Sequence, residues 1–447
     1  MRTAASETRA LGLVMCTALV VGNTVGMGIF MLPASLAPYG LNAIPAWLIT
    51  AAGSIFIAWV FAGLARTFPD DDGPIAYAGR AFGGGVAFTL MWCYWVSTWV
   101  TNAVLATGVV GYLSMFFPVL GINHWLAAVT ALSLLWLFVL INMRGVRTAG
   151  GVQVLSSALK LLPLFGIIVL GLWALFAPHA QALVVHVPTT PVTFSGVTAA
   201  SALALYAMLG VECAALPAGR VRDPARTIPR ATFIGTLLVA LICICASLVP
   251  ILLIPQAELA TSNAPFADVF ARFVGPASGK VLAAFVIVSG LGCLNGWTLI
   301  LGEITVSFAR HGAFPQALGK VNSHGAPTLA FVVTGLFASI MMISSYNDSM
   351  AGAFTFLSVV VTAANLPLYL GCALAVLVLW RRGKIPQPGA RELRWVAASF
   401  LALSYCVWIC FGFGGKSLLW ALALCVVGIP VYWWYAHVRR DAVAAGA

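Results

Sequence analysis

The chain has 447 residues, of which 62% are hydrophobic and only 8% charged, and its mean hydropathy is +1.01. This composition excludes a soluble globular protein and predicts an all-α polytopic membrane protein. The formal net charge is +11, but the basic residues are spread over many short loops, as is typical at an anionic lipid surface, so we expect no nucleic-acid partner.

Apolar segments long enough to cross a hydrocarbon core of ~30 Å recur along the chain, and we expect twelve transmembrane helices. The first segment is interpreted as helix 1 and not as a removable signal, because no small-residue cleavage site follows it. The expected spans are residues 11–36, 43–65, 84–117, 124–142, 150–176, 194–218, 230–254, 278–309, 326–346, 351–380, 395–413 and 417–437.

The first span contains three glycines within residues 22–28. An unwound turn in a bilayer survives only where protein or a water-filled cavity satisfies its backbone polar groups. This pattern predicts a broken helix 1 and a binding site near the middle of the membrane. The alternative is that the glycines only allow close helix packing.

The sixth span is also interrupted, since residues 206–217 combine Gly210, Glu212 and Pro217 within an apolar run. Two broken segments at corresponding places in two halves of a chain are typical of a transporter with inverted repeats. We therefore expect helices 1 and 6 to be broken and to flank the substrate.

Lysine and arginine are distributed asymmetrically between the two sets of loops. With both termini in the cytoplasm, nineteen basic residues lie inside, whereas Arg272, Lys280 and Lys416 lie outside. Cytoplasmic loops retain positive charge, so this distribution predicts that both termini are cytoplasmic.

The cysteines and histidines give no sign of a metal centre. All ten cysteines fall inside apolar segments without a Cys-x-x-Cys pair, and the six histidines have no metal-ligand spacing. We interpret the cysteines as small buried hydrophobes and expect no metal, no cofactor and no enzymatic activity.

Six motifs together resemble the amino acid-polyamine-organocation (APC) superfamily, and most of all its basic amino acid/polyamine antiporters of the arginine/agmatine type. The resemblance covers nearly the whole chain. The motifs are Gly-Asn-x-x-Gly-x-Gly-x-Phe at residues 22–30, Asn102, Gly-Val-Glu at 210–212, Asp-Pro-Ala-Arg at 223–226, Gly-Trp-Thr at 296–298 and Gly-Ala-Phe-Pro at 312–315.

The resemblance implies two inverted repeats of five helices, the LeuT-like or APC fold, followed by two peripheral helices. The expected units are residues 1–180, 181–385 and 386–447. The implied protein resides in the cytoplasmic (inner) membrane, with an amino acid or polyamine as its substrate and the lipid bilayer as its surroundings. A homodimer would match such relatives, although the sequence alone does not imply one.

An amino acid fits both ends of a broken helix. After the break, free N–H groups at Val25, Gly26, Met27 and Gly28 suit a carboxylate, and carbonyls near Thr24 and residues 206–209 suit an α-ammonium group. With the residues that the resemblance implies, the substrate-binding candidates are Thr24, Val25, Gly26, Met27, Gly28, Ser97, Thr98, Asn102, Leu105, Tyr206, Ala207, Leu209, Gly210, Cys293, Trp297 and Ser358.

Trp297 resembles the tryptophan of helix 8 that packs on the substrate in this family, and Tyr206 stands where a gating tryptophan is usual. An aromatic face attracts an ammonium or guanidinium by cation–π contact. Most of the fifteen tryptophans, Trp433 and Trp434 among them, are instead interpreted as interfacial or core residues. For Asn102 the alternative to substrate binding is an interhelical hydrogen bond.

Three ionisable residues, Lys160, Glu212 and Glu303, lie within the expected spans, where such groups are functional hypotheses by default. Glu212 resembles the helix 6 glutamate implicated in proton sensing, and with Tyr94 and Lys160 it is a candidate for proton coupling or gating. Structural alternatives exist for each: Glu212 could tie helix 6 to its neighbours, Lys160 could brace helix 1, and Glu303 could pair with a loop arginine.

Two departures from the arginine/agmatine pattern leave the mechanism open. Lys160 resembles proton-coupled members, in which a lysine stands in place of a sodium ion, and Met27 replaces a serine.

The favoured hypothesis is a basic amino acid/polyamine antiporter working by alternating access, and the alternative is a proton-coupled amino-acid symporter of broader or neutral specificity. A membrane receptor or integral enzyme is disfavoured, because the sequence has neither a sensor domain nor a catalytic cluster.

Overall fold

The computed structural model describes residues 12–68, 73–145, 159–176, 186, 188–214, 221, 223–310, 314–346, 349–385 and 389–433. Several predictions fall outside these ranges: the span portions 150–158, 215–218 and 434–437, residues 312–313 of one motif, and Trp434.

The described residues fold into a bundle of long helices, and short helices connect them. The long helices are α1 (Leu13–Thr24), α2 (Met27–Leu36), α3 (Ala43–Thr67), α5 (Gly84–Leu113), α7 (His124–Met143), α9 (Leu161–Phe176), α10 (Phe194–Tyr206), α11 (Pro224–Leu253), α14 (Pro276–Arg310), α15 (Thr328–Ser345), α16 (Met350–Arg381), α17 (Ala390–Ile409) and α18 (Gly415–Val426). The short ones are η1 (Ala37–Asn42), α4 (Pro74–Phe82), α6 (Val119–Ile122), η3 (Val211–Ala214), α12 (Gln256–Thr261), α13 (Pro265–Phe273), η5 (Gln316–Gly319) and η6 (Cys410–Gly412).

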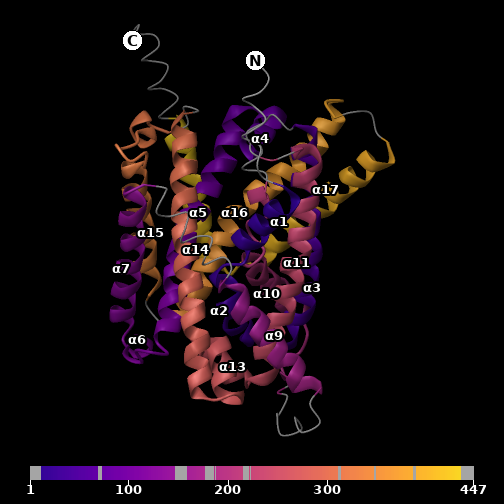
Figure 1. The fold of residues 1–447 in the computed structure, drawn as a ribbon. Coiled ribbons are helices and arrows are strands. Elements are labelled where there is room, and N and C mark those ends of the chain that lie inside the picture. The colour runs from indigo at the N-terminus through magenta and orange to yellow at the C-terminus, as the bar shows by residue number, and fades with distance from the viewer. Residues whose placement is uncertain are drawn as a thin grey trace.

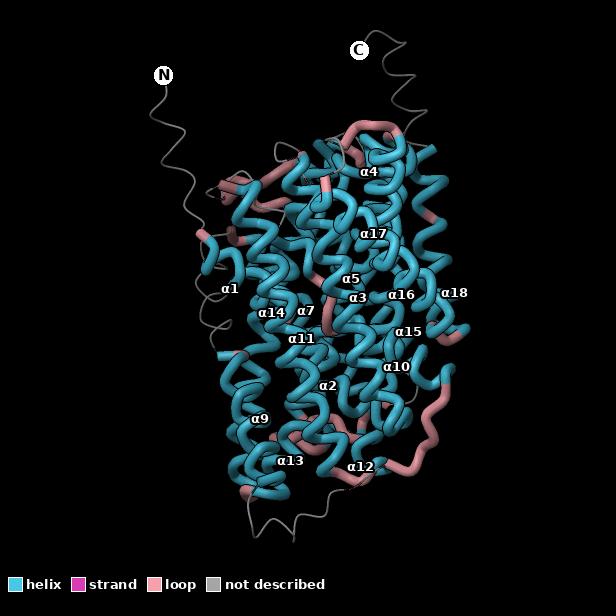
Figure 2. Tube along the Cα trace, turned by 90° about the vertical axis from the view of Figure 1, so that its right-hand side faces the viewer, coloured by secondary structure: helices cyan, strands magenta, loops and turns pink. Residues whose placement is uncertain are grey.

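Nine helical stretches of the described chain are long and apolar enough to cross a membrane, and α1, α9 and α10 contain shorter apolar helices. The helices run roughly along one axis, and most connecting loops gather at the two ends of the bundle (Figure 2). The protein is therefore a multi-pass membrane protein, as its composition predicted.

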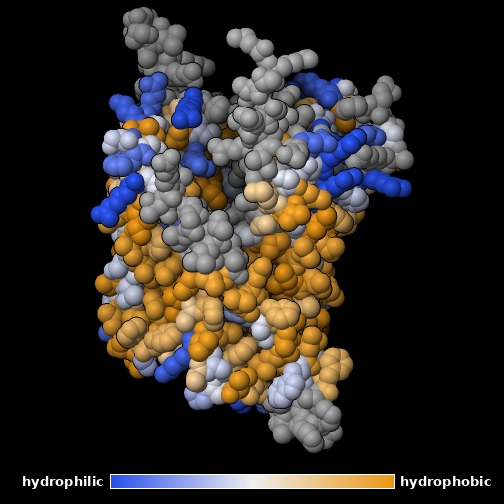
Figure 3. All heavy atoms as spheres, in the orientation of Figure 1, coloured by the Kyte–Doolittle hydropathy of each residue, from blue (hydrophilic) through white to orange (hydrophobic). Residues whose placement is uncertain are grey.

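The surface agrees with this assignment. On the face shown in Figure 3, hydrophobic residues cover the middle of the molecule and hydrophilic residues gather mainly at the upper end. The last turn of several helices carries an arginine: Arg66 in α3, Arg80 in α4, Arg310 in α14 and Arg381 in α16. The label of α4 lies at the upper end in Figure 1, opposite that of α13.

The short helices α4, α12 and α13 were not predicted, because they are too short or too amphipathic to give a transmembrane signal. Helix α13 packs against α14 and α2, and the ring of Phe266 lies 5.5 Å from that of Phe30 in an edge-to-face arrangement. This segment therefore packs directly against α2.

Candidate functional site

The first span is broken where the glycine pattern predicted a break. Helix α1 ends at Thr24, Val25 is extended with ψ of 94°, Gly26 is extended as well, and α2 begins at Met27. No side chain caps the start of α2. The N–H groups of its first turn have no partner within the helix, and they carry its positive dipole end.

The sixth span is broken as well. Helix α10 ends at Tyr206, a turn covers residues 207–210, and η3 follows. Gly210 has a φ of 105°, a left-handed conformation that a residue with a Cβ rarely adopts. Its N–H donates to the hydroxyl of Tyr369 on α16 at 3.4 Å, so the backbone at the break is tied to a neighbouring helix.

A cavity lies between the two breaks and the helices α5, α14 and α16. Its volume is about 30 Å³, which is room for about two water molecules. A ligand as long as an amino acid therefore requires the lining side chains to move apart. The lining residues are Thr24, Gly26, Gly28, Ser97, Thr101, Leu105, Tyr206, Ala207, Leu209, Trp297, Val361 and Asn365.

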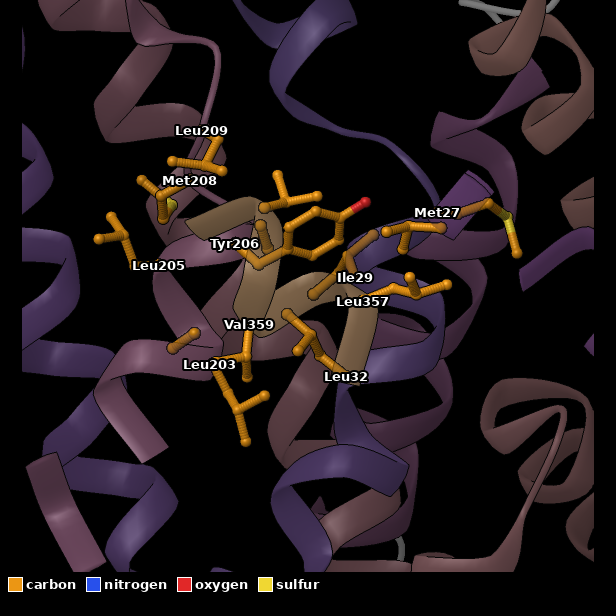
Figure 4. Packing of buried hydrophobic residues seen from close by; sticks show 14 of the residues in the cluster. Met27, Ile29, Leu32, Leu203, Leu205, Tyr206, Met208, Leu209, Leu357 and Val359 are labelled. Carbon is orange, nitrogen blue, oxygen red and sulfur yellow. The ribbon is translucent and has the colours of Figure 1, made fainter. Parts of the chain in front are cut away.

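Gly28 allows Tyr206 to close one side of this cavity. A Cβ built on Gly28 would lie 3.0 Å from two carbons of the Tyr206 ring, closer than nine in ten real Cβ contacts. Figure 4 shows this ring between the broken segments, with its hydroxyl directed toward the side of Met27. The absence of a side chain at residue 28 therefore determines how near α10 approaches α2.

Nine of the sixteen substrate-binding candidates line the cavity, and seven do not. The side chain of Met27 extends away from Tyr206 (Figure 4), toward Gly108 and Gly290 on α5 and α14. Thr98 Oγ1 donates to the Tyr94 carbonyl at 2.8 Å, and Ser358 Oγ donates to the Thr355 carbonyl at 2.9 Å.

The remaining candidates outside the cavity are Val25, Asn102, Gly210 and Cys293. Asn102 is 3% exposed, and its Oδ1 has no hydrogen-bond partner among the described residues. Unpaired buried acceptors are uncommon, so this carbonyl oxygen remains free for a ligand or for a change of conformation. The binding roles of all sixteen residues stay predictions.

Lys160 lies directly before α9 and is 1% exposed. Its ammonium group donates to the carbonyls of Gly22 and Val25, the latter at 3.0 Å, and lies 3.7 Å from Cys293 Sγ. These carbonyls are left without helical partners by the break. Lys160 therefore joins the negative end of α1 to α14, in keeping with the bracing role weighed above.

Glu212 is buried just beyond the second break. The hydroxyl of Tyr369 donates to its Oε2 at 2.6 Å, and Tyr94 interacts with the same carboxyl group. Glu212 and Tyr94 are therefore in contact, which a common role in gating requires, but neither residue lines the cavity. Glu303 is exposed on α14.

Thr101, Val361, Asn365 and Tyr369 were not among the predicted site residues. Thr101 follows Ser97 by one helical turn. Along α16 the polar residues Thr355, Ser358, Thr362, Asn365 and Tyr369 are spaced alternately by three and four positions. That spacing places them on one face of a helix. It was the signal that could have identified Asn365, which lies on this face and lines the cavity.

Comparison with known proteins agrees with the geometry. The family profile described as "Amino acid permease" matches residues 11–436. A cadaverine/lysine antiporter of Escherichia coli (strain K12) is 33% identical over 377 residues, which are 82% of this chain and 83% of that protein. The putrescine transporter PotE of the same strain is 28% identical over 427 residues, 96% of each chain.

Proposed function

Because the chain belongs to the amino acid permease family, we propose that it is a secondary active transporter that exchanges a basic amino acid for a polyamine. The relatives named above, a cadaverine/lysine antiporter and a putrescine transporter, support this substrate class. The ligand is carried unchanged, so no catalytic group is required and the protein is not an enzyme.

The observation that carries the proposal is the pair of helix breaks facing one cavity. Gly26 and Gly28 at the start of α2 line it, and so do Tyr206 and Ala207 at the end of α10. The N–H groups of α2 suit a carboxylate, and the carbonyls at the end of α10 suit an α-ammonium group. The aromatic face of Trp297 suits a second cation.

The proposal includes the finer architecture. Helices α1 with α2 form span 1 and α10 with η3 form span 6, so twelve spans follow in chain order. Residues 1–180 and 181–385 form two inverted repeats, and residues 386–447 add the peripheral pair. Alternating access then consists of rocking the broken helices against α5 and α16 around the cavity.

We place the protein in the cytoplasmic membrane with both termini inside. Arg66, Arg80, Arg310 and Arg381 stand at helix ends that this topology puts on the cytoplasmic side, whereas Arg272 and Lys280 fall on the opposite side. The positive-inside rule supports this orientation over its inverse.

For gating, we propose that the carboxyl group of Glu212 links the second break to α16 and α5 through Tyr369 and Tyr94. A change in its protonation would alter that link.

A proton-coupled symporter is the second candidate, and the buried ammonium of Lys160 at the first break favours it. In that case Lys160 takes part in the coupling to protons, whereas in the antiporter it is a fixed brace.

Uptake of labelled lysine and arginine into proteoliposomes distinguishes these functions. The vesicles are preloaded with cadaverine, with agmatine or with buffer, each with and without an inward proton gradient. The antiporter predicts uptake only into preloaded vesicles. Uptake into buffer-filled vesicles that requires the proton gradient would identify the symporter, and no uptake of either amino acid would reject the proposed substrate class.

A further inference from the structure

One wall of the cavity is not used by the recognition of an α-amino acid at the helix breaks. This acceptor wall consists of Ser97 and Thr101 on α5 and Asn365 on α16, and all three line the cavity. Their exposed fractions are 2%, 8% and 4%. Buried polar side chains in an apolar bundle are costly unless they are paired, so their hydrogen bonds decide what this wall can bind.

Both hydroxyl groups use their single hydrogen within α5. Ser97 Oγ donates to the Tyr94 carbonyl at 2.7 Å, and Thr101 Oγ1 donates to the Ser97 carbonyl at 2.8 Å. A hydroxyl has one hydrogen and two lone pairs. Ser97 and Thr101 therefore present only lone pairs to the cavity.

The orientation of Asn365 follows from the same network. Its Nδ2 donates to Ser97 Oγ at 3.4 Å. The reversed amide would bring two oxygen atoms face to face without a hydrogen between them, because Ser97 has already committed its own. Oδ1 of Asn365 is thus directed away from Ser97, and it has no hydrogen-bond partner within the described ranges.

We propose that Asn365, held by Ser97, determines specificity by accepting a hydrogen bond from a primary ammonium group at the distal end of the substrate. This inference rests on the proposed function and deepens it. An ammonium has three N–H donors and no acceptor, and the wall offers three acceptor oxygens. A carboxylate or amide oxygen at this place would face the lone pairs of Ser97, Thr101 and Asn365 Oδ1.

Two further features favour a primary ammonium. It is a compact charge with three donors, which three acceptor oxygens on two helices suit better than they suit the planar fork of a guanidinium. Among the described lining residues none is Asp or Glu, so neutral oxygens accept the hydrogen bonds. Neutral acceptors bind a cation less tightly than a carboxylate does, which allows the substrate to leave in each exchange cycle.

The test compares lysine with norleucine, which has the same side-chain carbons without the terminal ammonium. Equilibrium binding of both is measured on purified full-length protein. Asn365→Leu should lower the affinity for lysine about 10- to 100-fold, the effect of losing one hydrogen bond to a charged group, and leave norleucine unchanged. The matched control is Thr362→Val on the same helix, because the Thr362 hydroxyl donates to the Ser358 carbonyl and Thr362 does not line the cavity. Its ratio of lysine affinity to norleucine affinity should equal that of the wild type.

Asn365→Asp is a second variant that preserves the size of the side chain. It should raise the ratio of lysine affinity to norleucine affinity at least severalfold, because a charged acceptor strengthens the hydrogen bond to the substrate ammonium. A folded Asn365→Leu protein with the wild-type ratio would overturn the inference. If that variant does not fold, an unchanged ratio in Asn365→Asp would overturn it equally. If the wild type exchanges lysine but both Asn365 variants keep the wild-type ratio of lysine affinity to norleucine affinity, this subsite alone is rejected. If the wild type neither binds nor exchanges lysine or cadaverine, the proposed function is rejected as well.

Discussion

At the scale of single residues, the site depends on side chains that are absent as much as on those that are present. Gly28 allows the Tyr206 ring to close the cavity, while Gly26 opens onto it with only Leu105 nearby, 3.8 Å from a Cβ built on the glycine. The sequence predicted a helix break at these glycines because three of them lie close together in an apolar helix. It did not predict that the side chain of Met27 would point away, since no periodicity applies within a break.

Gly28→Ala should weaken substrate binding. The new methyl group would lie 3.0 Å from the Tyr206 ring, and overpacking of this kind costs about 1–3 kcal/mol. If that strain falls on the bound state, affinity for lysine drops about tenfold. Gly79→Ala in α4, whose nearest neighbour is 4.0 Å away, is the control. Wild-type affinity in Gly28→Ala would show that this contact does not shape the site.

Trp297→Leu should also weaken binding of cationic substrates, because it removes an aromatic face from the cavity. Cation–π contacts are worth about 0.5–2 kcal/mol, so the dissociation constant should rise about 2- to 30-fold. Trp433→Leu replaces an equally large ring that is 66% exposed and should leave the constant unchanged. Equal losses in both variants would mean that Trp297 acts through folding rather than through contact with the substrate.

At the scale of elements, long apolar helices could be predicted from the sequence, and short amphipathic ones could not. Residues 256–273 carry charged side chains, and they lack the length that marks a span, yet they fold into α12 and α13. Their position depends on distant contacts: the hydroxyl of Tyr112 donates to the Phe30 carbonyl at 2.9 Å and accepts the N–H of Phe266 at 3.4 Å. Such contacts between separate segments leave no local pattern.

Asp268 on α13 should make stability depend on pH. Burial holds its pKa above the ordinary value near 3.8, opposed by the hydrogen bond from Ser262, while the charge of Glu258 adds a smaller upward effect. Below the ordinary pKa both folded and unfolded states are protonated. As the pH rises, the unfolded state ionises first, so the folded state loses stability until its own raised pKa is passed.

Asp268→Asn removes this ionisation while an oxygen remains to accept the bond from Ser262. The variant should melt at a higher temperature than the wild type at pH 7, and the difference should shrink as the pH falls toward about 4. Melting of the variant and of the wild type in detergent across that range measures the difference. A difference independent of pH would exclude ionisation as its cause.

At the scale of the whole molecule, composition alone predicted a polytopic membrane protein, and the glycine patterns predicted both helix breaks. The contact between the two helices that form the acceptor wall was found only in the structure. Asn365 and Ser97 are 268 positions apart, and nothing local to either residue indicates that α16 packs against α5. Charge asymmetry, by contrast, predicts orientation without any knowledge of packing.

The orientation is tested by accessibility of single cysteines to a membrane-impermeant maleimide. Lys416→Cys should react in intact cells, and Lys384→Cys should react only after permeabilisation, because our topology places these two exposed residues on opposite sides. The wild-type protein measures background labelling of native cysteines. The reverse pattern would invert the topology, and equal labelling of both in intact cells would reject the assignment of the single span between them.

An experimental structure of the protein with lysine bound tests the transport site most directly. We expect the carboxylate of lysine against the N–H groups of residues 26–28, and its terminal ammonium between Trp297 and Asn365. Lysine bound elsewhere in the bundle, or in this cavity with its carboxylate toward Asn365, would contradict the central claim that the two helix breaks and the acceptor wall form the transport site.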